Sequence, residues 1–176
     1  AMSLAKDTLQ KAQAALDEHG FSEIHICPET MGKVNQLGTL EEVMELCKVD
    51  ERFLPCIDFG HLNARTYGGI RGTEDFQRIL DTIGRQLGAE RLKRFHSHFS
   101  KIAYTVPGGE KAHLTFADRE YGPAFEPLME LIAQKDLAPV IICESAGTQA
   151  EDAAAMQECY QICRQDACKT KGRTEA

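Results

Sequence analysis

Apolar and polar residues alternate along this chain of 176 residues with two different periods. Apolar residues that recur every three to four positions predict a helix, and short apolar runs bounded by turn residues predict a strand. Helices are expected over residues 4–19, 39–48, 73–86, 123–134 and 150–164. Strands are expected over residues 23–27, 53–57, 94–102 and 139–143. This alternation is typical of a parallel sheet with crossover helices.

Local signals mark three of the helix ends. Gly20 follows the first helix, where glycine commonly ends a helix. Thr39 and Glu42 have the spacing of a capping box at the start of the second helix. Thr73 is the expected N-cap of the third helix.

One leading helix and four strand-helix units amount to about half of a (β/α) barrel, which typically needs about 250 residues. We therefore expect an α/β fold of the TIM-barrel type, with half a barrel over residues 3–165 and a disordered tail over residues 166–176. The glycine-rich residues 60–72 and the long segment 102–122 are expected to be loops. Half a barrel has two unpaired edges, so we expect self-association or a missing N-terminal half.

Each of the four expected strands ends in a residue that can bind a metal. These residues are Glu29 in IHICPE, Asp58 and His61 in FLPCIDFGH, His96 in KRFHSHF and Glu144 in PVIICE. The carboxyl ends of parallel barrel strands open on one face, so these side chains are expected to converge on one pocket. Carboxylates and neutral imidazoles suit zinc, manganese or ferrous iron. The sequence therefore predicts a metal site on this face.

Charge restricts the class of partner. The net charge of −7 and the pI of about 5.4 argue against a bulk attraction to nucleic acid, although a local basic region remains compatible with them. Cations in the loops of the metal face make phosphate an expected ligand there. The expected substrate-binding residues are Arg65, Arg71, Lys101 and Lys111.

The sequence disfavours both a membrane protein and a disulfide-bonded protein. No apolar run approaches the roughly 20 residues that span a bilayer, and no signal-peptide pattern opens the chain, so we expect a cytoplasmic protein without a membrane partner. The seven cysteines include no CxxC pair and lie mostly in apolar segments, as reduced cysteines do. No metal site with a thiolate ligand is expected.

An ordered set of motifs connects these residues to a known family. The motifs are ETMGKVNQLG, IDFGH, HSHFSK, EKAHLTF and ICES. In this order they resemble the C-terminal half of endonuclease IV, within the xylose-isomerase-like superfamily of barrels. The resemblance implies a hydrolase, a zinc-dependent phosphodiesterase that cleaves DNA on the 5′ side of abasic sites. It also implies two or three zinc ions in the complete barrel, with manganese as an alternative.

The resemblance assigns a role to each site residue. Glu29 resembles a carboxylate that bridges two metals, and Glu29 and Glu144 are the expected catalytic residues. Asp58, His96 and Glu144 resemble the ligands of a second metal. His61 and His113 resemble the ligands of a third metal. Clustered divalent ions can hold a phosphate and lower the pKa of water near neutral pH, which agrees with this chemistry.

The chain departs from the family pattern at several positions. Two histidines from the second and third family strands have no counterpart, because those strands would precede residue 1. Lys111 occupies the position of the family aspartate two residues before His113, so the third metal is expected to lack its carboxylate. His98 replaces a family asparagine and is a candidate substitute ligand. The turn after Glu29 is one residue shorter than in the family.

Two other interpretations stay open. A sugar isomerase or epimerase of the same superfamily would use Glu29, Asp58, His96 and Glu144 with one manganese-like ion, and its two glutamates would move a proton beside a carbonyl. His113 distinguishes the nuclease from the isomerase, because only the nuclease is expected to use it as a metal ligand. The third interpretation is a non-catalytic half barrel that acts as an assembly partner, which a metal-free cluster of repelling carboxylates disfavours.

Overall fold

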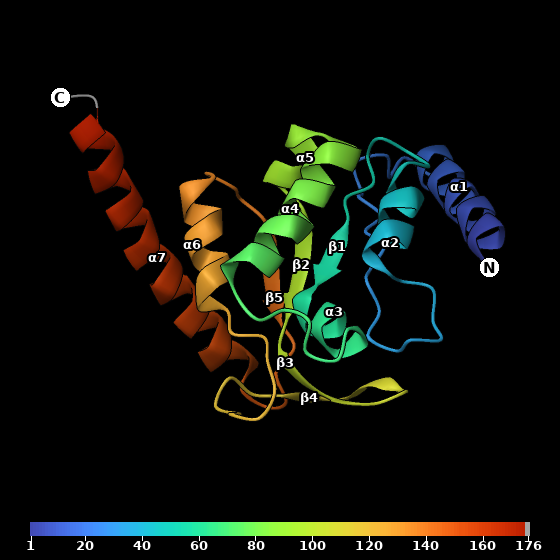
Figure 1. The fold of residues 1–176 in the computed structure, drawn as a ribbon. Helices are drawn as coiled ribbons and strands as arrows, with labels where there is room; N and C mark the ends of the chain where they lie inside the picture. The colour runs from blue at the N-terminus through green and yellow to red at the C-terminus, as the bar shows by residue number, and fades with distance from the viewer. Residues whose placement is uncertain (175–176) are drawn as a thin grey trace.

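The computed structural model describes residues 1–174 and contains the expected helices, but only three of the four expected strands lie in its parallel sheet (Figure 1). The first elements are α1 (Met2–Glu18), α2 (Leu40–Cys47), β1 (Cys56–Asp58), α3 (Phe59–Arg65), α4 (Thr73–Leu87) and α5 (Ala89–Lys93). They are followed by β2 (His96–Phe99), β3 (Lys101–Thr105), β4 (Gly109–Leu114), α6 (Glu126–Gln134), β5 (Val140–Cys143) and α7 (Gln149–Thr174). No helix among the described residues is both long enough and apolar enough to cross a membrane.

Three parallel strands form the sheet, in the order β1-β2-β5. The expected strand over residues 23–27 is not a regular strand, although its neighbourhood runs beside β1. Cys56 N–H donates to the Pro28 carbonyl at 2.8 Å, and Thr30 N–H donates to the Cys56 carbonyl at 3.0 Å. Pro28 has no N–H to continue the ladder, which explains the irregularity. The segment therefore lies at the edge of the sheet as a fourth, irregular strand.

The helices cover one face of the sheet and leave the other open. Phe59 lies at the centre of the covered side, with its ring centroid 5.3 Å from that of Phe76 and 6.1 Å from that of Phe99. On β5 the alternate residues Val140 and Ile142 are 58% and 47% exposed. Their exposure shows that the inner face of this sheet is uncovered. The fold is therefore half of an α/β barrel, and no closed barrel forms within the described residues.

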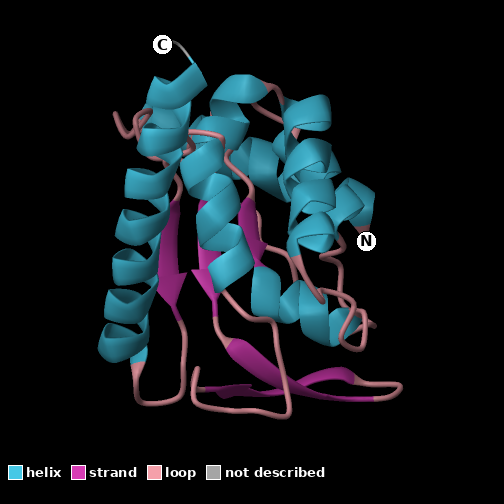
Figure 2. Ribbon diagram, turned by 60° about the vertical axis from the view of Figure 1, so that its left-hand side comes forward, coloured by secondary structure: helices cyan, strands magenta, loops and turns pink. Residues whose placement is uncertain are grey.

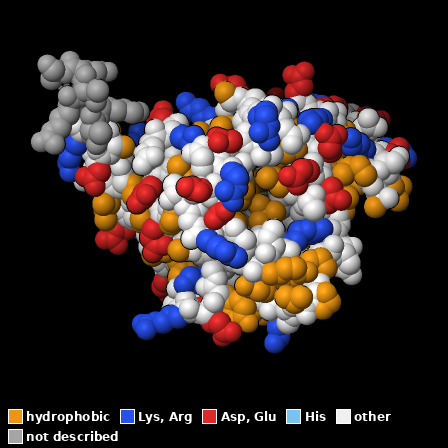
Figure 3. All heavy atoms as spheres, in the orientation of Figure 1, with side chains coloured by type: hydrophobic (Ala, Val, Ile, Leu, Met, Phe, Trp, Pro, Cys, Tyr) orange, Lys and Arg blue, Asp and Glu red, His pale blue; other side chains and the backbone are white. Residues whose placement is uncertain are grey.

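The outer side of the helices is a typical solvated surface. Figure 3 shows this side in the orientation of Figure 1, with acidic and basic side chains mixed over the helices. Such a surface is expected for amphipathic helices that pack on a sheet through their other side.

Two segments expected to be loops contain regular structure. Residues 60–72 begin within α3, and residues 102–122 include the second part of an antiparallel hairpin of β3 and β4. The expected strand 94–102 is correspondingly divided into β2 and the start of β3. Figure 2 shows the hairpin running across the ends of the parallel strands. The hairpin therefore forms one wall of the expected metal face.

The helix ends agree with the sequence signals in part. The capping box of α2 is present, since Thr39 Oγ1 accepts from Glu42 N–H at 3.2 Å and Glu42 Oε2 accepts from Thr39 N–H at 2.9 Å. The N-cap of α4 is Gly72 rather than Thr73, because the Asp75 carboxylate accepts from the Gly72 N–H. Helix α7 continues to Thr174, beyond its expected end. Residues 166–174 of the expected disordered tail are thus helical, and residues 175–176 lie outside the described part.

Candidate metal centre

A helix cap holds the two residues of the D-x-x-H motif together. Asp58 is the last residue of β1 and the N-cap of α3, and its Oδ1 atom accepts a hydrogen bond of 2.7 Å from the His61 N–H. Thr30 fixes the imidazole, because its carbonyl oxygen lies 2.9 Å from His61 Nδ1. Donation from Nδ1–H to this carbonyl leaves the lone pair of Nε2 available to a metal. The D-x-x-H motif therefore places a carboxylate and an oriented imidazole next to each other.

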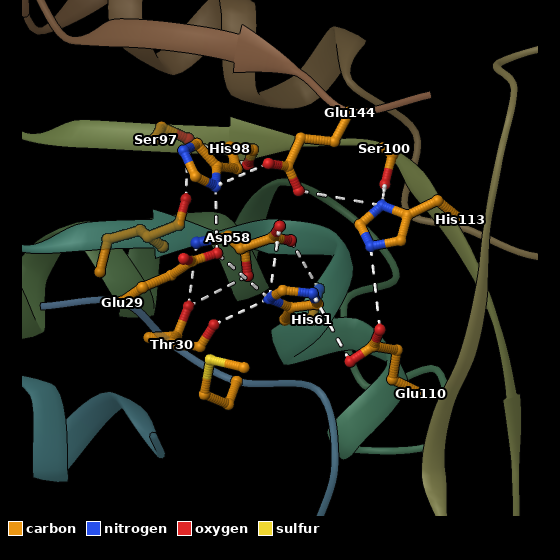
Figure 4. Close-up of polar contacts among 12 residues, drawn as sticks. Glu29, Thr30, Asp58, His61, Ser97, His98, Ser100, Glu110, His113 and Glu144 are labelled. Carbon is orange, nitrogen blue, oxygen red and sulfur yellow. Dashed lines mark hydrogen bonds and ion pairs between the residues drawn. The ribbon is translucent and has the colours of Figure 1, made fainter. Parts of the chain in front are cut away.

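Three carboxylates and one imidazole meet at the carboxyl ends of the strands (Figure 4). The ligand atoms of Glu29, Asp58, His98 and Glu144 all lie within 4.8 Å of one another. His98 Nδ1 is 3.0 Å from Glu29 Oε1 and 3.2 Å from Glu144 Oε1. The strand register contributes, because Asp58 and His98 are Cα partners on β1 and β2. We call these four residues the carboxylate cluster.

An oxygen atom without a hydrogen bond makes the carboxylate cluster suitable for a cation. The Asp58 side chain is 0% exposed, and its Oδ2 has no hydrogen-bond partner within the described residues. Burial raises the pKa of this carboxyl group. A buried polar atom left unpaired costs about 1–3 kcal/mol, which a bound ion would offset. The donor set fits zinc, manganese or ferrous iron.

A second group of candidate ligands lies beside the first and contains His61, Glu110 and His113 (Figure 4). His61 Nε2 is 3.6 Å from Glu110 Oε2, and His113 Nε2 is 3.8 Å from Glu110 Oε1. His113 Nδ1 is 2.9 Å from the Ser100 hydroxyl, which can accept its proton and so leave Nε2 free for a metal. We call these three residues the imidazole cluster.

A β-bulge brings Glu110 into the imidazole cluster. The pairing of β3 with β4 shifts by one residue between Ala103 and Tyr104, which leaves Lys111 as an extra residue. One extra residue reverses the alternation of side chains along a strand. Glu110 and His113 therefore lie on the same face although they are three residues apart. The structure thus corrects the expectation that the site of His113 lacks a carboxylate.

Protons balance the charges of the carboxylates when no metal is bound. Burial opposes the ionisation of Glu29, but hydrogen bonds with His61 and His98 hold its pKa down at about 2. Burial also opposes protonation of His61, yet the contacts with Glu29 and Asp58 raise its pKa to about 9. The hydrogen bond with Glu29 is the main cause of a raised pKa at His98. The protonated His61 imidazole therefore compensates the carboxylates near neutral pH in the metal-free protein.

Metal affinity is expected to rise with pH between about pH 7 and pH 9. A metal binds the unprotonated imidazole, and the pKa of His61 is raised to about 9, so a proton must leave below that pH. Each proton released strengthens the apparent affinity about tenfold per pH unit. Isothermal titration calorimetry with manganese in buffers of different ionisation enthalpy measures both the affinity and the protons released. Equal affinity at pH 7 and pH 8, with no proton release, would contradict this linkage.

The structure places His98, rather than His96, in the carboxylate cluster. His96 is the first residue of β2 and lies two residues further from the strand end, where its ligand atoms group with those of Cys56 and His98. Burial, followed by the nearby His98, lowers the pKa of His96. The sequence identified His98 only as a substitute ligand, and it did not indicate Glu110. The other expected metal ligands, Glu29, Asp58, His61, His113 and Glu144, all lie in the two clusters.

Arg65 binds protein backbone in this structure. Its guanidinium donates to four carbonyl oxygens of the loop after Glu29, at distances of 2.7–3.2 Å. These acceptors belong to Met31, Lys33, Val34 and Gln36. A guanidinium has five N–H donors, so these four bonds commit most of its capacity to holding the loop.

The other expected substrate-binding cations also lie outside the two clusters. Lys101 Nζ donates to the Asp118 carbonyl, and Arg71 Nε donates to the Gly68 carbonyl. Lys111 is exposed on β4 at the bulge. Of the four cations, Lys111 has the side chain with no bonded partner within the described residues, so it is the one most available to a ligand.

Comparison with known proteins agrees with this geometry. Residues 1–162 match the family described as xylose isomerase-like TIM barrel, whose superfamily includes metal-dependent isomerases and endonucleases. The chain is also 35% identical over 133 residues to an uncharacterized protein of Methanocaldococcus jannaschii. The match covers 76% of this chain and 47% of the relative, so the chain spans about half the length of that protein. The chain belongs to the xylose isomerase-like TIM barrel family.

Proposed function

We propose that this chain carries the metal-binding half of a phosphodiesterase that resembles endonuclease IV and cleaves DNA at abasic sites. The observation that carries the proposal is the contact between the two clusters. His61 Nδ1 is 3.5 Å from Glu29 Oε1, and His113 Nδ1 is 4.0 Å from Glu144 Oε2. Ions held by the two clusters would be close neighbours, as hydrolysis of a phosphodiester by paired metals requires.

The charge of the site supports more than one ion. Four carboxylates converge there, from Glu29, Asp58, Glu110 and Glu144. Their mutual repulsion is unfavourable unless cations or protons compensate it. Two divalent ions carry the matching positive charge, whereas one ion leaves a net negative site that would repel a phosphate.

The protein groups would hold and orient such ions. The carboxylate cluster would hold one ion and the imidazole cluster another, with zinc favoured by the imidazoles and manganese as the alternative. When bound, the ions supply positive charge to the phosphate and lower the pKa of water toward neutrality. Thr30 and Ser100 fix the imidazoles of His61 and His113 through Nδ1. Fixed ligands require little reorganisation during the reaction, which favours catalysis.

A sugar isomerase or epimerase is the second candidate. The carboxylate cluster contains two glutamates, an aspartate and a histidine, which is a complete ligand set for one ion and for proton transfer beside a carbonyl. The commitment of Arg65 to backbone carbonyls also removes one cation that a phosphate would use. This enzyme would leave the imidazole cluster without a role, which is why we rank it second.

Abasic-site DNA should be cut by protein expressed from the whole reading frame that contains these residues. We propose this activity for the closed barrel, because the open sheet must first be covered by further strands or a second copy. Incision of a duplex with one abasic analogue should require zinc or manganese and stop in excess chelator, while the undamaged duplex stays intact. A metal-loaded protein that leaves the abasic duplex uncut would overturn the proposal, and epimerisation of a ketose would favour the second candidate.

A further inference from the structure

A thiol and two imidazoles converge beside the carboxylate cluster, nearer the amino ends of β1 and β2. Cys56 and His96 are Cα partners on β1 and β2, and His98 follows on the same side of β2. The ligand atoms of Cys56, His96 and His98 lie within 4.8 Å of one another. The rings of His96 and His98 meet edge to face, with centroids 5.2 Å apart and an interplanar angle of 78°. The strand register therefore builds this group.

Two of these side chains have no other bonding role. Cys56 is 2% exposed. Within the described part of the chain, neither the Cys56 thiol nor a ring nitrogen of His96 has a hydrogen-bond partner. Cys143, another buried cysteine, does have one, as its Sγ contacts Met156 Sδ at 3.6 Å. The ligand atoms of Cys56 and His96 are therefore not committed to another partner within the described residues and are free to bind a metal ion.

The chemistry of this group differs from that of its neighbour. A thiolate with two imidazoles is a soft set that selects zinc or cuprous ions, whereas carboxylates and water suit manganese or magnesium. An imidazole can bind a metal through either ring nitrogen. His98 already directs Nδ1 toward Glu29 and Glu144. It therefore belongs to both groups.

We propose that Cys56, His96 and His98 form a second metal site for a thiophilic cation such as the zinc or cuprous ion. The Cys56 thiol would release its proton to solvent and bind as the thiolate. Because His98 is shared, and because two nearby cations repel each other, an ion in this site opposes binding of an ion in the carboxylate cluster. The pattern along the chain offers no reason to expect a thiolate ligand, since the cysteine is isolated in sequence. The proposed site does not depend on which reaction the complete barrel catalyses, but the shared His98 couples it to the carboxylate cluster.

Cobalt(II) is a suitable probe of this site, because a cobalt–thiolate bond gives a near-ultraviolet charge-transfer band that carboxylates and imidazoles do not give. The band should form in the unmodified chain and disappear in Cys56→Ser. In His96→Gln, the dissociation constant for cobalt, measured from the growth of the band, should rise by at least about tenfold. The matched control Cys47→Ser, at another buried cysteine, should keep it. Absence of the band in the unmodified chain, or its persistence in Cys56→Ser, would overturn the proposal.

A second measurement avoids substitutions that could disturb folding. Alkylation of each cysteine in the unmodified chain is followed by peptide mass spectrometry with zinc or with manganese present. Zinc should slow the modification of Cys56 more than manganese does, and neither ion should protect the exposed Cys168. Equal protection of Cys56 by the two ions would show that no thiophilic ion binds there.

Discussion

Replacing Asp58 by asparagine should reduce the affinity for divalent metal by more than about 100-fold, the upper range for residues that only orient a ligand. Asp58 Oδ2 is the buried carboxylate oxygen without a hydrogen bond, and asparagine removes its charge. Asparagine is also a good N-cap, so the bond from the His61 N–H to Oδ1 can persist and α3 should stay folded. Titration calorimetry with manganese measures the affinity, and thermal unfolding with and without metal measures the linked stabilisation.

The metal-free Asp58→Asn protein should be at least as stable as the unmodified chain. Burial raises the pKa of Asp58, so its charged form is unfavourable in the folded state. A suitable control is Asp75→Asn, because Asp75 also accepts hydrogen bonds from backbone N–H groups at a helix start but lies on α4, away from the site. The control should keep full affinity. Unchanged manganese affinity in Asp58→Asn would remove the carboxylate cluster as a metal site.

The residues that the sequence could predict are those whose position depends on local geometry. Asp58 and His61 are joined by a helix cap, so a spacing of three residues is enough to place them together. Glu144 directly follows β5, and the carboxyl end of a parallel strand defines its location. The half-barrel fold follows from the same local patterns. The order of the main helices and strands can therefore be inferred from the sequence alone.

The residues that the sequence missed depend on contacts between distant segments. His96 and His98 lie on the same side of β2, because side chains alternate with period two, and only the register against β1 and β5 shows which one reaches the carboxylates. Glu110 points to His113 only because the hairpin contains a bulge. Arg65 has a charge that suits phosphate, but four carbonyls of a loop some 30 residues earlier surround it. None of these contacts leaves a pattern in neighbouring residues.

The imidazole cluster offers the sharpest separation of the two proposed enzymes. In the assembled protein, Glu110→Gln and His113→Ala should each lower the turnover number for abasic-site incision by about 100-fold or more, since each removes a ligand of a reacting metal. Glu110→Gln keeps the shape of the side chain while it removes the charge near Nε2 of both histidines. The resulting loss should therefore reflect metal binding rather than misfolding, which circular dichroism can verify.

An isomerase should respond differently to the same variants. Its ligand set in the carboxylate cluster stays complete when Glu110 or His113 is replaced, so ketose epimerisation should change by less than about tenfold. Glu90→Gln on α5, an exposed carboxylate away from both clusters, provides a control that should leave either activity unchanged. Incision that falls with both cluster variants and not with the control supports the nuclease. The order of the two candidates would be reversed if epimerisation survives both variants and abasic DNA is not cleaved in zinc or manganese. Those results would show that the imidazole cluster is unnecessary for the chemistry.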